Sequence, residues 1–504
     1  VWQGDEDIVL RGGGGAGGVV EAKGAAGGEE GHGEFTATHP FTAPVHTAKW
    51  LTNPDLSQAS LCEGITEDGR VWGDSKRVVY CEVNISDMHT AYHPGDSIGV
   101  CTPNPPYCVN VLLKRLRQAH EERAINADTK ILLPQLSCVK SLGEVLTYHY
   151  DLTGMPKKSA VKALAKYCLD DADKRCLLAL VHKDFKGLWT DFVEKQGLGI
   201  AELIYLFKSC LPTIPQLCSV LCPAVPRYYS IASSPLATPN RIGFAFSTVR
   251  YVCQVPHQDG PSSQFEIKRS GVATLFLEST LRRFLYPQHA NRADKPALRI
   301  FYKPTLCFRP PHNLSTPLIL IGPGTGVAPF ISFLAQRYAQ ELDKRKQSHS
   351  GDCCGEGLWR GGFELEDLPS ERGAVDKYID SCVPGDVVLF FGCRNEDDFL
   401  FKQELALYER EHTLTRLYVA MSRQSEKKVY VMHKIAEQSD YLCDLIVQQH
   451  AQVYICGDGN KMAKDVIAAL KDVLVQGGME RDGAEAYVTD MQQRKRLLLD
   501  IWSP

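Results

Sequence analysis

Four strongly apolar segments in the C-terminal part of the chain each end in small or polar residues, and helical patterns separate them. The segments are PLILIGPG (317–324), VVLFFGCR (387–394), RLYVAMSR (416–423) and QVYICGDG (452–459). Strands that are apolar throughout and alternate with helices form parallel sheets covered on both faces. We therefore predict a doubly wound parallel sheet within residues 309–504. Because ligands bind at the carboxyl ends of such strands, the residues that end these segments are the first candidates for a site.

The first segment runs into Gly322-Pro323-Gly324-Thr325-Gly326, directly before a predicted helix. Glycines let the backbone approach a ligand closely, and the free N–H groups of a helix N-terminus attract anions. The loop therefore suits the diphosphate of a dinucleotide, although it lacks the spacing of the ordinary dehydrogenase fingerprint. The alternative interpretation is a tight strand-to-helix turn that needs small residues.

Ser422, Arg423, Lys428 and Tyr430 follow the third apolar segment. Two cations and a hydroxyl group suit a phosphate dianion, and a tyrosine ring can stack on a base. Such a cluster favours NADPH over NADH, because only NADPH carries the 2′-phosphate. The alternative interpretation is a solvated polar loop.

The overall composition argues against several other classes of protein. The net charge of −4 gives no reason to expect binding to nucleic acid or to an anionic membrane. Glycines and prolines interrupt the longest apolar stretch, residues 318–334, so we predict no membrane-spanning helix. The 18 cysteines include no Cys-x-x-Cys pair, and we predict no metal centre. In the absence of an export signal, we expect reduced thiols in a cytoplasmic enzyme.

The residues before 309 indicate a β domain interrupted by helices, behind a glycine-rich start. Residues 11–33 contain 11 glycines and offer almost no side chain to bury, which predicts a flexible linker. Strand patterns at 78–85, 97–101, 241–252 and 298–308 flank helical patterns such as 156–167 and 191–207. We expect a linker (1–38), the first part of a β-barrel (39–104), a helical connecting domain (105–220), the second part of the barrel (221–308) and the parallel-sheet domain (309–504), with a surface insertion at 348–386.

Two further motifs and two single residues complete the set of candidates for cofactor binding, and a flavin would suit several of them. Arg227-Tyr228-Tyr229-Ser230 begins a strand pattern, and its arginine could pair with a pyrophosphate while a tyrosine ring covers a flavin face. Gly271-Val272-Ala273-Thr274 is a glycine turn that enters a helix, a second site ready for an anion. Cys456 ends the fourth apolar segment, and Trp502 lies near the end of the chain. A buried small hydrophobe and a tryptophan packed on the sheet are the alternative interpretations of these two residues.

In this order, the motifs resemble the ferredoxin–NADP⁺ reductase-like half of the diflavin reductases. They are Arg227-x-Tyr-Ser, Gly271-x-x-Thr, Gly322-Pro-Gly-Thr-Gly, Ser422-Arg, Cys456-Gly-Asp and Asp500-x-Trp-Ser. The resemblance runs from about His39 to the end, and it implies an antiparallel FAD-binding β-barrel with a helical connecting insertion, then a doubly wound NADP-binding domain. Residues 93–104, 155–175 and 500–503 look most like the branch that serves methionine synthase. Residues 227–234, 271–274 and 425–431 look at least as much like the branch that serves cytochrome P450.

The resemblance also implies roles for matching positions. The implied FAD site comprises Arg227, Tyr228, Tyr229, Ser230, Ala245, Phe246, Ser247, Tyr251, Gly271, Val272, Ala273, Thr274 and Trp502. The implied NADP site comprises Gly324, Thr325, Gly326, Ser422, Arg423, Lys428, Tyr430 and Asp465. Ser230, Cys456, Asp500 and Trp502 would be the catalytic residues around the hydride path. Trp502 would cover the flavin until the nicotinamide enters, and Asp500 would steady the positive charge that builds on the nicotinamide.

The activity implied by the resemblance is an NADPH-dependent, FAD-containing reductase that passes electrons to FMN on a flavodoxin-like domain. We expect that FMN domain to be missing before residue 39, which makes the glycine-rich start an inter-flavin hinge. The expected final acceptor is the cobalamin of methionine synthase, and the alternative is cytochrome P450. A non-catalytic flavin-domain scaffold is the alternative from another class, and the intact set of catalytic positions argues against it.

Overall fold

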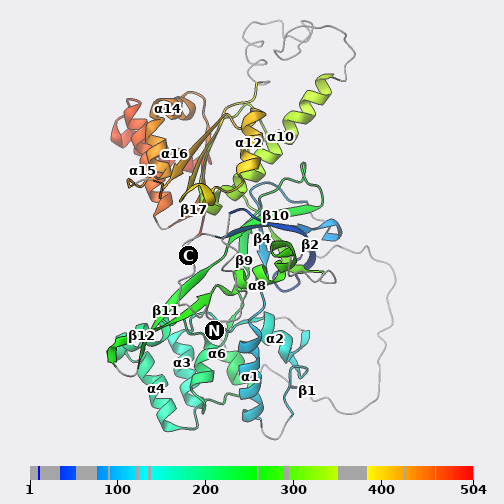
Figure 1. Cartoon of the computed structure of the whole chain (residues 1–504), viewed down its shortest axis with the longest axis vertical. Coiled ribbons are helices and arrows are strands. Elements are labelled where there is room, and N and C mark those ends of the chain that lie inside the picture. The colour runs from blue at the N-terminus through cyan, green and yellow to red at the C-terminus, as the bar shows by residue number, and fades with distance from the viewer. Residues whose placement is uncertain are drawn as a thin grey trace. The chain divides into compact units, whose positions relative to one another are not determined.

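The computed structural model describes residues 10–11, 35–52, 77–88, 91–120, 124–133, 138–257, 260–287, 295–349, 383–424, 426–459 and 461–502. The chain forms two compact units, each of which is discontinuous in sequence (Figure 1). The first unit consists of Val1–Pro40, Val100–Arg227 and Val249–Thr280. The second unit consists of Phe41–Gly99, Tyr228–Thr248 and Leu281–Pro504.

The first unit is mainly helical. Its principal helices are α1 (Pro106–Ala119), α2 (Leu142–Tyr148), α3 (Lys158–Leu164), α4 (Asp171–Val181), α6 (Ile200–Leu206) and α7 (Ile214–Val220). Local sequence explains where they begin: prolines start α1, and the Asp170 carboxylate caps α4 by accepting a hydrogen bond from the Ala172 N–H at 2.9 Å. Their apolar faces meet in one core, which includes Leu112, Val161 and Leu203.

One helical prediction in this unit is only partly correct. Residues 191–207 do not form a single helix, because a short helix α5 (Lys186–Trp189) and a π-helical turn (Thr190–Glu194) are followed by a break. Gly197 adopts a φ of +59° there, a left-handed conformation that glycine accepts without strain. The chain then restarts as α6, where the Glu202 carboxylate accepts a hydrogen bond from the Gly199 N–H at 2.7 Å.

The first unit also contains an antiparallel hairpin of β11 (Arg250–His257) and β12 (Gly260–Ser270), followed by helix α8 (Val272–Thr280). The strand predicted over 241–252 is therefore interrupted between β10 (Arg241–Ser247) and β11. Within the predicted linker, Leu10–Arg11 is a short strand, β1, that pairs with β5 (Lys130–Leu133). Residues 12–34 of that linker lie outside the described residues.

The second unit contains the predicted barrel. Its strands are β2 (Phe41–Trp50), β3 (Val78–Asn84), β4 (Ser97–Val100), β9 (Arg227–Ser230), β10 and β13 (Ala297–Lys303), in the order β10-β3-β2-β13-β4-β9. An antiparallel bridge between Ile231 and Phe244 joins the two edges, and the Ala232 N–H donates to the Gly243 carbonyl at 2.7 Å. The sheet therefore closes on itself, as a barrel requires.

The same unit contains the predicted parallel sheet. Its strands are β14 (Leu318–Pro323), β15 (Val387–Cys393), β16 (Arg416–Met421), β17 (Gln452–Asp458) and β18 (Leu497–Trp502), in the order β16-β15-β14-β17-β18. The helices are α10 (Ala328–His349), α12 (Lys402–Arg410), α13 (Val431–Glu437), α14 (Ser439–Val447), α15 (Met462–Gln476) and α16 (Arg481–Gln493). Figure 1 shows α14, α15 and α16 on one side of the strands, with α10 and α12 on the other.

Burial on both faces explains the continuous apolar strands. Leu318 and Leu320 belong to the core on the α10 side, whereas Ile319 and Ile321 belong to the core on the α15 side. The doubly wound prediction is confirmed. The strand order reverses between β14 and β17, and ligands of open α/β sheets bind at the carboxyl end of such a reversal.

The fifth parallel strand, β18, was not predicted as a strand, and it places Asp500 and Trp502 at the sheet. The predicted insertion at 348–386 begins inside α10, and its residues 350–382 lie outside the described residues. In the described part of the chain, none of the helices combines the length and apolar character needed to cross a bilayer.

Candidate functional site

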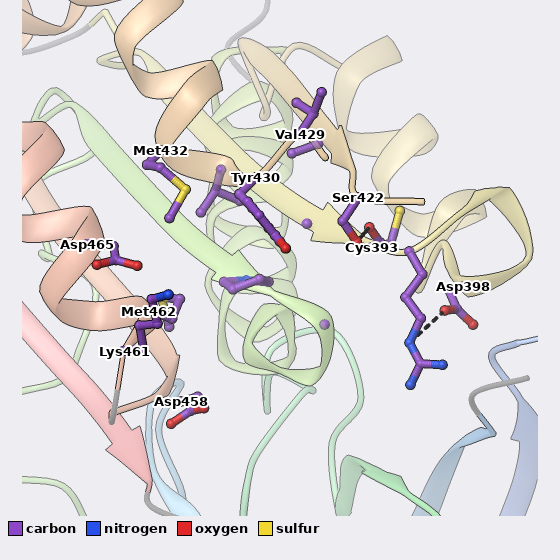
Figure 2. Close-up of a pocket in the computed structure, with 16 residues that line it drawn as sticks. Cys393, Asp398, Ser422, Val429, Tyr430, Met432, Asp458, Lys461, Met462 and Asp465 are labelled. Atoms are coloured by element: carbon purple, nitrogen blue, oxygen red, sulfur yellow. Dashed lines mark hydrogen bonds and ion pairs between the residues drawn. The ribbon is translucent and has the colours of Figure 1, made fainter. Parts of the chain in front are cut away.

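A pocket of about 490 Å³ lies where the parallel strands end. Its lining comes from the ends of β14, β15, β16 and β17 and from the first turns of α13 and α15. Figure 2 shows Ser422, Cys393 and Asp398 to one side, Asp458, Lys461 and Asp465 to the other, and Tyr430 between the two groups. The pocket therefore occupies the reversal of strand order.

The glycines of the 322–326 loop have different tasks. Gly324 lines the pocket and has a φ of +59°, which favours glycine. A Cβ added to Gly326 would lie 2.2 Å from the Cys456 carbonyl oxygen, and one added to Gly322 would lie 2.6 Å from the Gly326 carbonyl oxygen. Gly322 and Gly326 are therefore required by close backbone packing, which is the tight strand-to-helix turn given as the alternative interpretation. Gly324 is the glycine of this loop that lines the pocket.

Four of the predicted NADP residues line the pocket: Gly324, Ser422, Tyr430 and Asp465. The lining does not include Thr325, Gly326, Arg423 or Lys428. The Ser422 hydroxyl and N–H both donate to the Cys393 carbonyl, at 3.3 and 3.0 Å, and the Arg423 N–H donates to the Arg394 carbonyl at 2.8 Å. These bonds hold the loop after β16 against the loop after β15, and the side chains of Arg423 and Lys428 are exposed.

Two pocket cations were not identified from the sequence. Arg394 follows β15 directly, and its Nε lies 3.7 Å from the Asp398 carboxylate. Lys461 directly precedes α15. Arg394 could have been found by the rule that selected Ser422, because it too stands at the carboxyl end of a buried strand.

A polar cluster lies at the ends of β9, β17 and β18. The Ser230 hydroxyl donates to the Asp500 Oδ2 at 2.8 Å, and the Cys456 Sγ lies 3.7 Å from the same oxygen. Cys456 and Asp500 are register partners in the parallel ladder, which fixes their proximity. Burial, together with the Asp500 carboxylate, raises the pKa of the Cys456 thiol well above its usual range. The thiol is therefore a neutral donor near neutral pH.

Aromatic side chains lie close to this cluster in sequence. Tyr229 packs on Phe244 and Phe246, with ring centroids 5.3 and 6.2 Å apart. Tyr228 is 46% exposed, and the Lys303 Nζ lies 3.9 Å from its ring centroid. Trp502 is 41% exposed at the end of β18. Water-exposed aromatic faces of this kind fit a planar ring ligand.

Other predicted FAD residues divide between the two units. Ala245, Phe246 and Ser247 end β10 in the second unit, and Ala245 and Phe246 are buried. Arg227, Tyr251 and Gly271 to Thr274 belong to the first unit.

At the start of α8, the chain forms a closed turn. The Gly271 N–H donates to the Val249 carbonyl at 2.8 Å, and the Thr274 hydroxyl donates to the Gly271 carbonyl at 3.1 Å. The same hydroxyl accepts a hydrogen bond from the Val249 N–H at 3.1 Å. A Cβ added to Gly271 would lie 2.9 Å from the Val249 Cβ, so the turn requires glycine. The donors of this helix N-terminus fit a pyrophosphate.

Comparisons with known proteins agree with this geometry. The family model described as FAD binding domain matches residues 70–265, and the one described as Oxidoreductase NAD-binding domain matches residues 320–467. The chain is 31% identical to methionine synthase reductase of Bos taurus and 30% identical to that of Homo sapiens, over 96% of this chain and 64% of each relative. The chain therefore contains an FAD-binding and an NAD-binding oxidoreductase domain, and it is similar to the corresponding part of diflavin reductases. It is also 29% identical to NADPH–cytochrome P450 reductase of Cavia porcellus, over 93% of this chain and 59% of that relative.

The two family-model matches overlap the barrel and the parallel sheet, and they identify FAD- and NADP-binding domains in the chain. The chain spans less than two thirds of the length of these relatives. The resemblance inferred from the six ordered motifs is confirmed at the level of the family.

Proposed function

We propose that this chain is the NADPH-oxidising, FAD-binding part of a reductase that reactivates cobalamin-dependent methionine synthase. The observation that carries the proposal is the cluster in which Ser230 and Cys456 both approach the Asp500 carboxylate, at 2.8 and 3.7 Å. A carboxylate that is hydrogen-bonded by a hydroxyl and approached by a buried neutral thiol suits a site that stabilises the positive charge developing on a nicotinamide during hydride transfer.

The pocket at the strand ends would hold NADPH. Ser422, Arg423, Lys428 and Tyr430 would bind the 2′-phosphate and adenine, with Arg394 and Lys461 as further cations. Gly324 would approach the diphosphate, Thr325 and Gly326 would shape the loop behind it, and Asp465, which lines the pocket, would also bind NADPH. Arg423 and Lys428 are exposed, so they would turn toward the phosphate on binding.

The proposed FAD-binding residues fall into two sets. Tyr229 and Trp502 would cover the two faces of the flavin, and Tyr228, Ala245, Phe246 and Ser247 would complete its pocket. Arg227, Tyr251 and the turn from Gly271 through Val272 and Ala273 to Thr274 would bind the pyrophosphate and adenine. When bound, the two cofactors supply hydride transfer between a nicotinamide and a flavin.

The protein's own contribution to that chemistry is electrostatic and positional. The Ser230 hydroxyl orients the Asp500 carboxylate through their 2.8 Å hydrogen bond. The negative carboxylate stabilises positive charge that develops on the nicotinamide. Burial keeps the Cys456 thiol neutral, so this side chain adds no second negative charge beside the Asp500 carboxylate. Trp502 excludes water until it is displaced.

The partner and acceptor assignments rest on the relatives. We propose an FMN-containing flavodoxin-like domain as the immediate partner, with residues 1–38 as the hinge. Methionine synthase is the proposed acceptor because methionine synthase reductases match at 30–31% identity over 96% of the chain. NADPH–cytochrome P450 reductases match at 29%, so cytochrome P450 is the second candidate acceptor.

The test begins with purification of the chain, release of its flavin and anaerobic mixing with NADPH or NADH. One FAD per chain and bleaching that strongly prefers NADPH are expected. Loss of that preference in Lys428→Ala would assign the 2′-phosphate site. A chain without flavin, or with flavin that NADPH does not bleach, would contradict the proposal. Adding a separate FMN domain with methionine synthase or cytochrome P450 then distinguishes the acceptors.

A further inference from the structure

The helical unit contains two cysteines that face each other across an isolated antiparallel bridge, Cys168 and Cys210. Two backbone hydrogen bonds of 3.0 Å flank the pair, from the Leu169 N–H to the Ser209 carbonyl and from the Leu211 N–H to the Tyr167 carbonyl. This pattern makes Cys168 and Cys210 a non-hydrogen-bonded pair, the kind in which the Cα atoms are about 4.5 Å apart. That separation lies within the range that disulfides accept, about 4.4–6.8 Å.

The two thiols also point to the same place. The Sγ atoms of Cys168 and Cys210 lie 3.8 and 3.5 Å from one acceptor, the Leu164 carbonyl oxygen at the end of α3. Two sulfur atoms that share one acceptor on one side of a bridge are positioned to meet. In the described part of the chain, no other two cysteines are paired across a bridge or a strand ladder.

The two cysteines differ in access. Cys168 is partly exposed, and its neighbour Leu169 is 79% exposed. Cys210 is 1% exposed. A small reagent would therefore reach Cys168 first, and Cys210 would lie behind it in the position of a resolving thiol.

We propose that Cys168 and Cys210 form a reversible dithiol–disulfide pair that a low-molecular-weight disulfide, such as oxidised glutathione, can oxidise. The Cys168 thiolate attacks one sulfur of the reagent, so that a mixed disulfide forms and one reagent thiolate leaves. The Cys210 thiolate then attacks the Cys168 sulfur, which forms the protein disulfide and releases the second reagent thiolate. Two protein thiols lose two electrons and two protons, and the reagent gains them as two thiols.

The surroundings set the pace of this exchange. Burial raises the pKa of both thiols, and Asp173 acts in the same direction on both. Asp170 also raises the pKa of Cys168, whereas Ser209 lowers it and Arg115 lowers that of Cys210. We expect slow oxidation near neutral pH, because the thiolate is the reactive form. The new bond would join the chain just after α3 to the segment before α7 and close a loop containing α4 and α6.

The experiment uses the full chain, incubated with oxidised or reduced glutathione, denatured, alkylated and mapped by mass spectrometry. The expected result is a linked peptide pair containing Cys168 and Cys210, with neither of these two thiols alkylated, and recovery of both with dithiothreitol. The oxidised chain should also melt at a higher temperature, because a cross-link restricts the unfolded chain. Cys168→Ser and Cys210→Ser should each abolish the linked peptide.

Cys176→Ser is the matched control, because Cys176 is exposed and lies outside the Cys168–Cys210 bridge. This substitution should leave the linked peptide unchanged. The wild-type map decides the question even where a variant folds poorly. Alkylation of both Cys168 and Cys210 after oxidant has modified Cys176 would overturn the proposal. A stable mixed disulfide on Cys168 with Cys210 still alkylated would also overturn it.

Discussion

Replacing Asp500 with asparagine tests the centre of the proposed mechanism. Asparagine keeps the shape of the side chain and can still accept the hydrogen bond from the Ser230 hydroxyl, which lies 2.8 Å away. What disappears is the negative charge. Hydrogen bonds to charged groups contribute about 1.5–3 kcal/mol, and each ~1.36 kcal/mol corresponds to tenfold in rate. The rate of flavin reduction by NADPH should therefore fall by about 10- to 150-fold.

The same substitution has a second consequence, at Cys456. The Asp500 carboxylate is one cause of the raised pKa of this thiol, and burial is the larger cause. Asp500→Asn should lower the pKa of Cys456 while burial keeps it above the usual range, so the thiol stays protonated near neutral pH. The pH profile of flavin reduction in the variant should therefore contain no additional ionisation from Cys456 near neutral pH.

Anaerobic stopped-flow absorbance measures the reduction rate directly, with flavin content and NADPH affinity measured alongside. Asp490→Asn is the matched control, because this exposed carboxylate on α16 pairs with the Arg494 Nε at 2.8 Å and lies outside the cluster. Asp490→Asn should reduce at the wild-type rate. A rate within about threefold of wild type in Asp500→Asn, with full flavin and unchanged NADPH affinity, would refute the assigned role.

Three further predictions concern the packing around the site and the stability of the fold. Gly326→Ala places a Cβ 2.2 Å from the Cys456 carbonyl oxygen, so it should lower the free energy of unfolding by about 1–3 kcal/mol and weaken NADPH binding. Gly187→Ala, where no atom lies within 4 Å, should be neutral or stabilising in the same urea and titration experiments. Burial raises the pKa of Cys218 from 9.0 to about 11. The contribution of this thiol to the free energy of unfolding is therefore fully present below pH 9 and is lost as the pH rises to about 11. Urea unfolding should show a loss of about 3 kcal/mol over that window from this thiol, which Cys218→Ala removes and Cys176→Ala does not. The buried Arg337 contacts the Glu341 carboxylate at 3.2 Å and two backbone carbonyls at 2.6 Å, so Arg337→Ala should cost about 3–5 kcal/mol of unfolding free energy. Arg410→Ala, which removes an exposed pair with Glu411, should cost about 1 kcal/mol or less, and equal costs would contradict the argument.

The sequence predicted the parallel sheet because its signal is local. Residues 318–323 are apolar at every position, and residues 318–322 are buried because helices pack on both faces of the sheet. The strand ends then identify Ser422 and Cys456 by a general rule of α/β sheets. Strand β18 was not predicted, because it directly follows a helix and a basic turn. Its place at the edge of the sheet depends on pairing with β17.

Only some of the site residues could be predicted from their spacing in the sequence. Ser230 and Asp500 are 270 positions apart, and no periodicity relates them. Their proximity was expected only from the family resemblance. The strand-end rule that selects Ser422 applies equally to Arg394, which directly follows β15. Lys461 carries no local signal, because its relevance depends on where α15 begins relative to the pocket.

The surroundings of the polar cluster include a buried carboxylate, Asp96, which lies in the resembling segment 93–104 but was not predicted as a site residue. Asp96 is fully buried in the second unit and accepts hydrogen bonds from the Thr305 N–H at 2.7 Å, the His93 N–H at 2.8 Å and the Tyr302 hydroxyl. Arg309 pairs with the same carboxylate at 3.2 Å.

The backbone around Asp96 connects the two sheets of this unit. The Asp96 carbonyl accepts a hydrogen bond from the Ile231 N–H at 2.9 Å, directly after Ser230. The Arg309 carbonyl accepts one from the Tyr454 hydroxyl at 2.6 Å, two residues before Cys456. A buried charge is tolerated when hydrogen bonds and an ion pair compensate for its lost hydration. Here those compensating bonds hold barrel strand β9 and parallel strand β17 in place, and this is why a serine and a cysteine distant in sequence can meet at one aspartate.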